Sequence, residues 1–310
     1  MDRQKIVVGL GELLWDLFPS GKQLGGAPAN FAYITSLLGD VGIPVSRVGS
    51  DEHGREARQR LAELGLRAMF IQEDRAHPTG TVNVVMNDGL VNAGQMNNGQ
   101  HRFEIRENVA WDFLEFTEVE AQLAAMADAV CFGSLAQRSS ASRTTILRFL
   151  RATQAEAVRV FDVNLRQNFY SKEILEQSMK LATIMKLNHE ELPKIMRMFE
   201  MTMSTEQDAA RELLTLCGVK LVCITRGASG SLLVSAEECC QHPGFKVKVA
   251  DTVGAGDAFT AALVHGYLRG MSLAEINEKA NRVGAWIAGQ SGAMPNVARE
   301  SLPQMLQGIS

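Results

Sequence analysis

The sequence lacks the features that mark secreted, zinc-binding and membrane proteins. No apolar run reaches the length of a membrane-spanning helix, and we expect no signal peptide because the sequence begins with a strand-like segment. We therefore expect no membrane partner. The cysteines are odd in number and have no Cys-x-x-Cys spacing, so we expect reduced thiols in a cytoplasmic protein, with no disulfide framework or zinc site. They are Cys131, Cys217, Cys223, Cys239 and Cys240.

An excess of positive charge and a Walker motif are also missing. The chain has 31 Lys and Arg residues against 35 Asp and Glu, a net charge of −4, and no long basic run. This composition argues against a nucleic-acid partner. No G-x-x-x-x-G-K-[ST] string occurs, so any phosphate site must use another turn. The length of 310 residues predicts one large domain or a domain with an appendage, and the 46% of hydrophobic residues is enough for a substantial core.

The stretch 251–259, DTVGAGDAF, is where we expect chemistry. A β-rich segment, Phe245–Val249, precedes it, and a helix-like run follows from Ala258. Glycines before a helix N-terminus leave N–H groups and a positive dipole end free to bind phosphate. Asp257 would repel a resting anion, but it can take the proton from a hydroxyl that attacks a phosphoryl group. A plain glycine turn, with Asp257 as a helix-start residue, is the alternative.

Polar residues near the N-terminus form a second candidate site. Glu12 and Asp16 follow the first predicted strand, where carboxylates can accept hydrogen bonds from sugar hydroxyls or can be ordinary solvated charges. In the string GGAPAN, Gly26 lets the backbone approach a ligand, and the amide of Asn30 can both donate to and accept from hydroxyls. A turn and helix cap is again the alternative.

Strand-like and helix-like segments alternate along the rest of the chain, which predicts an α/β fold with a mainly parallel sheet. A β insertion, with strands at 81–86 and 102–105 around an Asn/Gly-rich hairpin, interrupts the alternation. Asp162, Asn164 and Arg166 are predicted to project to one side of a strand end. The other predicted strands are 5–10, 45–48, 68–71, 129–132, 158–166, 220–225 and 231–234, with a strand and then a turn over 184–191. The predicted helices are 28–38, 53–64, 140–152 and 273–288.

The two glycine strings together resemble the GGxxxN and DTxGAGDxF signatures of the ribokinase-like (PfkB) sugar kinases, and the run GELLWDLFP…GGAPANFA is most similar to bacterial fructokinases. The resemblance extends from Gly9 to Asn296. It implies one kinase domain, 1–310, with a three-layer α/β/α ribokinase-like fold and a small β lid from about 12–25 and 73–112. Such a lid would exclude water, and its open strand edges could pair two subunits into a homodimer.

The resemblance also implies an ATP- and Mg²⁺-dependent kinase that phosphorylates a primary hydroxyl of a small sugar. Asp257 would be the base, and the turn Gly254, Ala255 and Gly256 would stabilise the developing charge. Glu191, of an N-x-x-E motif, would hold Mg²⁺ through water, and Asp251, Val253 and Gly292 would bind a monovalent cation such as K⁺. The sugar would be held by Asp16, Gly26, Asn30, Arg106 and Arg166, and the nucleotide by Asn188, Thr225, Gly227, Gly230 and Asn281.

Three functions remain open. The resemblance to bacterial fructokinases makes D-fructose the first choice of substrate. 2-Keto-3-deoxygluconate is the second, because an acid substrate would want more positive charge than Arg106 and Arg166 offer. A sugar- or nucleotide-binding sensor that has lost catalysis is a different class of function, against which the retention of Asp257 and Glu191 argues.

Overall fold

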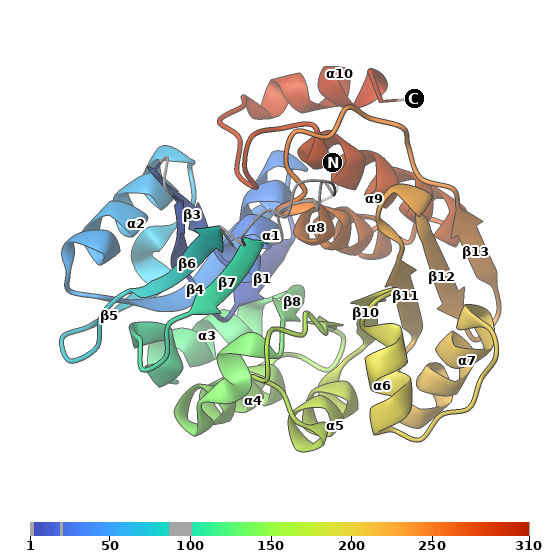
Figure 1. The fold of residues 1–310 in the computed structure, drawn as a ribbon, viewed down its shortest axis with the longest axis horizontal. Coiled ribbons are helices and arrows are strands. Elements are labelled where there is room, and N and C mark those ends of the chain that lie inside the picture. The colour runs from blue at the N-terminus through green and yellow to red at the C-terminus, as the bar shows by residue number, and fades with distance from the viewer. Residues whose placement is uncertain (1–2, 19–20, 87–100, 310) are drawn as a thin grey trace, which may run out of the picture.

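The computed structural model describes residues 3–18, 21–86 and 101–309. Its largest element is a nine-stranded sheet that lies between two layers of helices (Figure 1). The hairpin predicted between Asn87 and Gly99 lies outside the described residues. The nine strands are β1 (Ile6–Leu10), β4 (Val41–Gly49), β5 (Ile71–Asp74), β8 (Ala129–Phe132), β9 (Val158–Asp162), β10 (Ile184–Asn188), β11 (Leu221–Thr225), β12 (Ser231–Ser235) and β13 (Cys239–His242).

The strand order is β13-β12-β11-β10-β9-β8-β1-β4-β5. All neighbours from β11 to β5 pair in parallel, and β12 and β13 close one edge in antiparallel fashion. The mainly parallel sheet predicted from the alternating pattern is therefore confirmed. Parallel strands end together at one edge, and open α/β sheets bind their ligands there.

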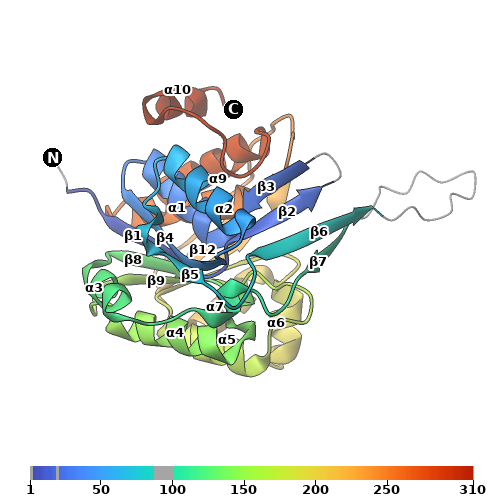
Figure 2. The ribbon, with the colours of Figure 1, turned by 90° about the vertical axis from the view of Figure 1, so that its left-hand side faces the viewer.

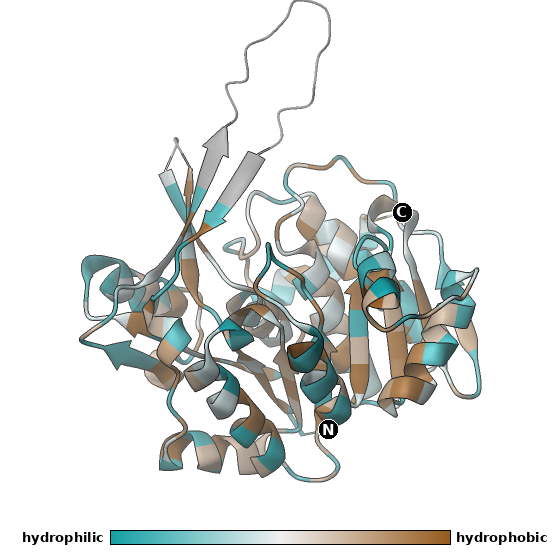
Figure 3. Ribbon diagram, turned by 60° about the horizontal axis from the view of Figure 1, so that its bottom comes forward, coloured by the Kyte–Doolittle hydropathy of each residue, from teal (hydrophilic) through white to brown (hydrophobic). Residues whose placement is uncertain are grey.

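Helices cover both faces of this sheet, so its strands are apolar along most of their length (Figure 3). Within the described ranges no helix combines the length and apolarity that a bilayer span requires. One face is covered by α1 (Ala27–Leu37), α2 (Glu52–Glu63), α8 (Ala255–Tyr267) and α9 (Leu273–Ala288), and the other by α3 (Glu118–Met126), α4 (Ser140–Ala152), α5 (Lys172–Leu181), α6 (Leu192–Met198) and α7 (Glu206–Cys217), with α10 (Leu302–Gln307) near the C-terminus.

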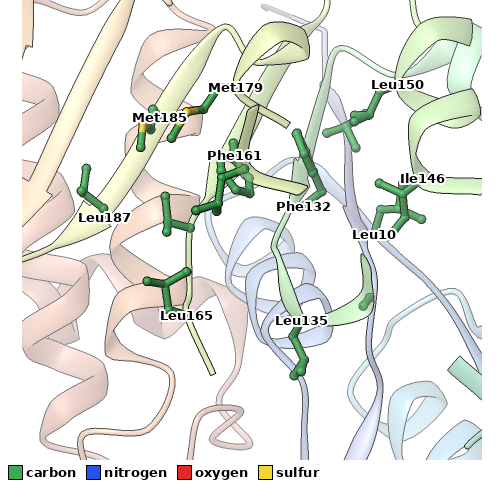
Figure 4. Packing of buried hydrophobic residues seen from close by; sticks show 14 of the residues in the cluster. Leu10, Phe132, Leu135, Ile146, Leu150, Phe161, Leu165, Met179, Met185 and Leu187 are labelled. Carbon is green, nitrogen blue, oxygen red and sulfur yellow. The ribbon is translucent and has the colours of Figure 1, made fainter. Parts of the chain in front are cut away.

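Aromatic rings pack the middle of the second face. Phe132 of β8 and Phe161 of β9 stack with their ring centroids 5.3 Å apart, in the same cluster as Leu10 and Met185 (Figure 4). Both phenylalanines are fully buried. This packing fixes the spacing of the central strands, and with it the positions of the polar residues that follow them.

A second, four-stranded sheet projects from one side of the helical layers (Figure 2). Its order is β3-β2-β6-β7, with β2 and β6 parallel and the two outer pairs antiparallel. It corresponds to the predicted β insertion together with part of the N-terminal segment. Its strands are β2 (Leu14–Phe18), β3 (Gly21–Gly25), β6 (Gly80–Met86) and β7 (His101–Ile105).

Three local predictions are wrong. The segment Phe245–Val249 belongs to no strand. Its alternating apolar residues fit a strand, but the chain is crossing from the sheet edge to α8, and Ala250 N–H bonds the carbonyl of Ala288 at the end of α9 instead. Residues 68–70 form a 3₁₀ turn before β5. Strand β9 ends at Asp162, and Asn164 has a φ of 43°, so the predicted same-side alternation of Asp162, Asn164 and Arg166 does not occur.

A buried arginine ties the base of the second sheet to the body. Arg138 donates to both carboxylate oxygens of Asp112, each at 2.8 Å, and to the carbonyl of Arg106 at 2.6 Å. Its guanidinium also lies over the ring of Trp111, 4.0 Å from the centroid. Both side chains of the Arg138–Asp112 pair are only 6% exposed. The pair therefore fixes the chain where it leaves β7.

Replacing Asp112 by alanine should lower the free energy of unfolding by about 3–5 kcal/mol, because it leaves a buried guanidinium without its counter-charge. Urea unfolding followed by circular dichroism measures this change. Glu173→Ala is the matched control: it breaks an ion pair with Arg143 in which the Glu173 side chain is 65% exposed, and should cost less than about 1 kcal/mol. Equal effects of the two substitutions would contradict the role given to the buried pair.

Candidate active site

The candidate site lies where the central parallel strands end and where two helices begin. Helix α8 starts at Ala255, and its N-cap Gly254 has a φ of 79°, in the left-handed region. A Cβ added to Gly254 would lie 2.2 Å from the Cβ of Ala293, so this glycine is required both by its conformation and by close packing. Ala255 N–H donates to Thr252 O at 3.3 Å. The N–H groups of Gly256 and Asp257 lie in the first helical turn, where no intrahelical acceptor exists.

Two residues far apart in the sequence meet at this turn. Asn30, in the first turns of α1, donates from Nδ2 to Oδ2 of Asp257 at 2.8 Å. The other amide atom, Asn30 Oδ1, is buried and has no hydrogen-bond partner. A buried acceptor without a donor is costly, so it is an expected place for a ligand hydroxyl. The structure thus brings together Asn30 and Asp257, which the sequence predicted separately.

Asp257 lies in an acidic environment. Burial and the nearby Asp162 raise its pKa from 3.8 to about 6, while Asn30, Lys186 and Arg166 act in the opposite direction. A carboxylate with this pKa is largely ionised at neutral pH and still basic enough to take a proton.

Glu12 lines the same small cavity as Asp257. It is 4% exposed, and burial together with the charge of Asp257 raises its pKa to about 7. Its carboxylate accepts from Ala27 N–H at 3.3 Å. Gly26, with a φ of 114°, allows this approach, because a Cβ there would lie 2.4 Å from the carbonyl of Glu12. Between Glu12, Asp162 and Asp257 lies a cavity of about 10 Å³.

Asp16 and Arg166 do not line this cavity, but the charge of Arg166 acts on Asp16, Glu12 and Asp257. Asp16 lies in β2 of the second sheet, and burial raises its pKa to about 6 although the charge of Arg166 opposes this shift. Arg166 also lowers the pKa of Glu12 and of Asp257. Arg166 therefore reaches the acids from the loop after β9, and not from a strand as the sequence predicted. Arg106 is exposed just after β7.

Sequence reasoning missed a buried ion pair beneath the glycine turn. Lys186 of β10 donates to both carboxylate oxygens of Asp162, at 3.1 and 3.0 Å. Thr260 Oγ1 of α8 lies 3.1 Å from Asp162 Oδ2 and 2.9 Å from the carbonyl of Gly256. The signal was present in the string IMKLN: a lysine inside an otherwise apolar buried strand must have a buried partner.

The N-x-x-E motif closes the turn after β10. Asn188 Oδ1 accepts from the N–H groups of Glu190 and Glu191, both at 2.9 Å. The Glu191 carboxylate is buried and accepts from Leu165 N–H and Asn188 N–H, both at 2.8 Å. Burial raises the pKa of Glu191, and the charge of Lys186 opposes this. Each carboxylate oxygen keeps a lone pair, which suits a metal-bound water better than direct coordination.

The turn between β11 and β12 presents backbone to solvent. Thr225 ends β11, and Gly227 has a φ of 57° with open space around it. Gly230 has a φ of 80°, and a Cβ there would lie 1.9 Å from the carbonyl of His242. Asn281 of α9 lies nearby but is buried: its Nδ2 donates to Ser231 Oγ at 2.7 Å and contacts Oδ1 of Asn277 at 3.0 Å. Its amide therefore orders the helix against β12.

The loops around 251 and 292 lie beside the glycine turn. Val253 N–H donates to Asp251 Oδ1 at 3.0 Å. Gly292 has a φ of 78°, and a Cβ there would lie 3.2 Å from Oε1 of Gln23, in β3 of the second sheet. Among the residues that the structure describes, no group of three acidic, histidine or cysteine side chains could hold a metal ion.

Comparisons with known proteins show which family and which solved structures the chain is similar to. Residues 19–299 match the model of the pfkB family carbohydrate kinase. The fructokinase of Escherichia coli is 30% identical over 306 residues, which are 92% of this chain and 94% of that protein. The crystal structure of a sugar kinase from Pyrococcus horikoshii superposes with a TM-score of 0.81 at 28% identity, covering 98% of this chain and 99% of that one.

Two complexes are also similar. The same Pyrococcus protein with ATP gives a TM-score of 0.79 at 27% identity, covering 97% of this chain and 99% of that one. Aminoimidazole riboside kinase from Salmonella enterica, with its riboside and an ATP analog, superposes with a TM-score of 0.76 at 26% identity, covering 98% of this chain and 100% of that one.

Proposed function

Because the chain belongs to the pfkB family of carbohydrate kinases, we propose that it transfers the γ-phosphoryl group of ATP to a primary hydroxyl of D-fructose. The observation that carries this proposal is the Asn30–Asp257 contact of 2.8 Å at the first turn of α8. It sets a carboxylate, an unpartnered amide oxygen and free helix N–H groups side by side. A sugar hydroxyl can bind there next to a phosphoryl group.

In the proposed reaction Asp257 accepts the proton of the substrate hydroxyl. The hydroxyl oxygen forms a bond to the γ-phosphorus, the bond from that phosphorus to the bridging oxygen breaks, and ADP leaves. The N–H groups of Gly256 and Asp257 stabilise the charge that grows on the transferred oxygens. Asn30 fixes the carboxylate and accepts a hydrogen bond from the sugar. Asp16, Gly26, Arg106 and Arg166 complete the sugar site in this proposal, and the second sheet closes over it as a lid that belongs to the single kinase domain.

ATP would lie along the turn at Thr225, Gly227 and Gly230 and reach the glycine turn with its phosphates, with Asn188 and Asn281 completing its site. Mg²⁺ bound to the nucleotide would meet Glu191 through water, and would neutralise charge on the phosphates. The loops that carry Asp251, Val253 and Gly292 lie beside Gly254 and would hold a monovalent cation. The open edges of β3 and β7 would serve a homodimer, which sedimentation analysis tests.

Fructose is favoured over a sugar acid by the charges of the site. Glu12, Asp162 and Asp257 line the cavity, Lys186 is paired with Asp162, and Arg166 is an exposed cation whose charge acts on Glu12, Asp16 and Asp257. A carboxylate substrate would therefore enter an acidic pocket. A neutral polyol would instead find hydrogen-bond acceptors.

An ADP-release assay over a panel of fructose, glucose, ribose, 2-keto-3-deoxygluconate and aminoimidazole riboside tests the proposal. We expect the highest kcat/KM for fructose. A higher value for the sugar acid would replace the proposed substrate. If the protein binds ATP but releases ADP with none of these sugars, it is a sensor that has lost catalysis.

The activity should depend on pH through Asp257. With fructose, kcat/KM should rise as the pH increases through about 6, where Asp257 loses its proton. Below that pH the carboxyl group is protonated and cannot accept the hydroxyl proton. Initial rates between pH 5 and 8, at fixed ionic strength and saturating ATP, measure this profile. A flat profile over this range would contradict the assignment of Asp257 as the base.

A further inference from the structure

The buried pair of Lys186 and Asp162 lies next to the proposed base. The two side chains are 8% and 6% exposed. Burying two charges costs desolvation energy that their attraction only partly returns, so such a pair is weak support for a purely stabilising role. An apolar residue at position 186 would fit the IMKLN strand better. The presence of the pair is therefore better explained by a role in the candidate active site than by a contribution to stability.

The pair is anchored to the turn that carries Asp257. A Cβ added to Gly256 would lie 3.2 Å from Lys186 Nζ, which places the ammonium directly under the glycine turn. Thr260 Oγ1 lies within hydrogen-bonding distance of both Asp162 Oδ2 and the carbonyl of Gly256. The ammonium, its carboxylate partner and the first turn of α8 thus form one connected unit.

The charges around Asp257 come from several elements, and they oppose one another. Burial and the charge of Asp162 raise the pKa of Asp257, whereas the hydrogen bond from Asn30 and the charges of Lys186 and Arg166 lower it. Charge also acts between Glu12 and Asp257. The Cys131 thiol of β8 has its pKa raised by burial and by the same acids, so it stays neutral. Arg166 is exposed to solvent and screened, whereas Lys186 is buried, so the charge of Lys186 acts at higher strength.

We propose that Lys186 is a positioning residue for the reaction: held in place by Asp162, its ammonium keeps Asp257 ionised and able to accept a proton beneath the glycine turn. This inference rests on the proposed kinase function, because it gives Asp257 the role of base. Lys186 acts through Asp257 and not on the substrate.

The first test is the pH profile of kcat/KM in three variants. Lys186→Met removes the positive charge, so the rise of kcat/KM with pH (the acid limb of the profile) should move to higher pH by about one pH unit in this variant. Asp162→Asn removes the negative charge, so its limb should move to lower pH. The double variant K186M/D162N loses both charges, and its limb should return close to that of the wild type. A purely structural role would not move the two single variants in opposite directions.

Controls separate charge from folding. Lys180→Met, on the exposed side of α5, removes the same charge away from the site and should leave the profile unchanged. Should K186M fail to fold, Lys186→Gln carries the same expectation, since it keeps a donor for Asp162. Limbs that do not move, or that move in the same direction for both single variants, would overturn the inference.

A second measurement is independent of catalysis. The folded-state pKa of Asp257, about 6, lies above its usual value of 3.8. The protonated carboxyl therefore stabilises the fold, and this stabilisation is lost as pH rises from 3.8 through about 6. The difference in unfolding free energy between the wild type and D257N reports this loss. In a K186M background the loss should extend about one pH unit higher.

The two proposals fail in different ways. If the wild type phosphorylates no sugar, the proposed function is wrong, and the unfolding measurement still decides whether Lys186 controls the ionisation of Asp257. If fructose is phosphorylated but neither the pH profile nor the unfolding profile changes in K186M, the kinase assignment stands and the role of Lys186 is refuted.

Discussion

Replacing Asp257 by asparagine should lower kcat by roughly 10²- to 10⁴-fold, the range that loss of a general base produces. The amide cannot take a proton, whereas its size and its contact with Asn30 Nδ2 can be kept by the remaining oxygen. The backbone N–H groups of the first turn of α8 are unchanged, so the Kd for ATP should stay within about threefold. Steady-state kinetics and calorimetric titration with an ATP analog measure the two quantities separately.

Asp208→Asn is a suitable control, because it removes a carboxylate from the start of α7, where Asp208 bonds only the helix cap Thr205 among the interactions of the described residues. Its kcat should match that of the wild type. Unchanged turnover in D257N would exclude Asp257 as the base. A loss of ATP binding as large as the loss of turnover would instead show that the substitution damages the nucleotide site.

Gly254→Ala should have the second-largest effect. The residue has a φ of 79°, and its new Cβ would lie 2.2 Å from the Cβ of Ala293 and 2.9 Å from its Cα. The left-handed conformation and this overlap together should lower the free energy of unfolding by about 2–4 kcal/mol. The turn must also shift relative to Asp257, and a displacement of about 1 Å can cost about 100-fold in kcat/KM.

Gly270→Ala separates conformation from packing. Gly270 has a φ of 65° but no heavy atom within 4 Å of an added Cβ. The G270A substitution should lower the free energy of unfolding by only about 1 kcal/mol, from the backbone conformation alone, and should leave kcat/KM unchanged. Urea unfolding and fructose kinetics compare the two variants. Similar losses in both would show that the contact with Ala293 does not matter.

Much of the fold could be predicted from local patterns. The strand predicted at 129–132 is a short apolar run because helices cover both faces of the sheet, and β8 has the same bounds. The strand predicted at the start of 184–191 is observed as β10. Helix α9 spans the predicted range 273–288, where Ser272 caps the first turn and mostly apolar residues form the buried face. Each of these signals lies within a few neighbouring residues.

The candidate site was harder to predict from the sequence, because it depends on contacts between segments that are far apart in the chain. Asn30 and Asp257 could each be suspected from a glycine string, but only the fold shows their hydrogen bond. The partner of Lys186 lies on the neighbouring strand, 24 residues earlier in the chain. Arg166 was predicted in a strand because the alternation of residues 162–166 continues past the point where β9 ends.

The Asn30–Asp257 contact spans 227 residues of the chain. Local segments can fold as they leave the ribosome, which synthesises about 5–20 residues per second. Asn30 can therefore form this hydrogen bond only after most of the chain has been synthesised. A nascent protein released before α8 would hold its first strands and helices without a functional centre, so premature termination should yield inert fragments rather than partly active ones.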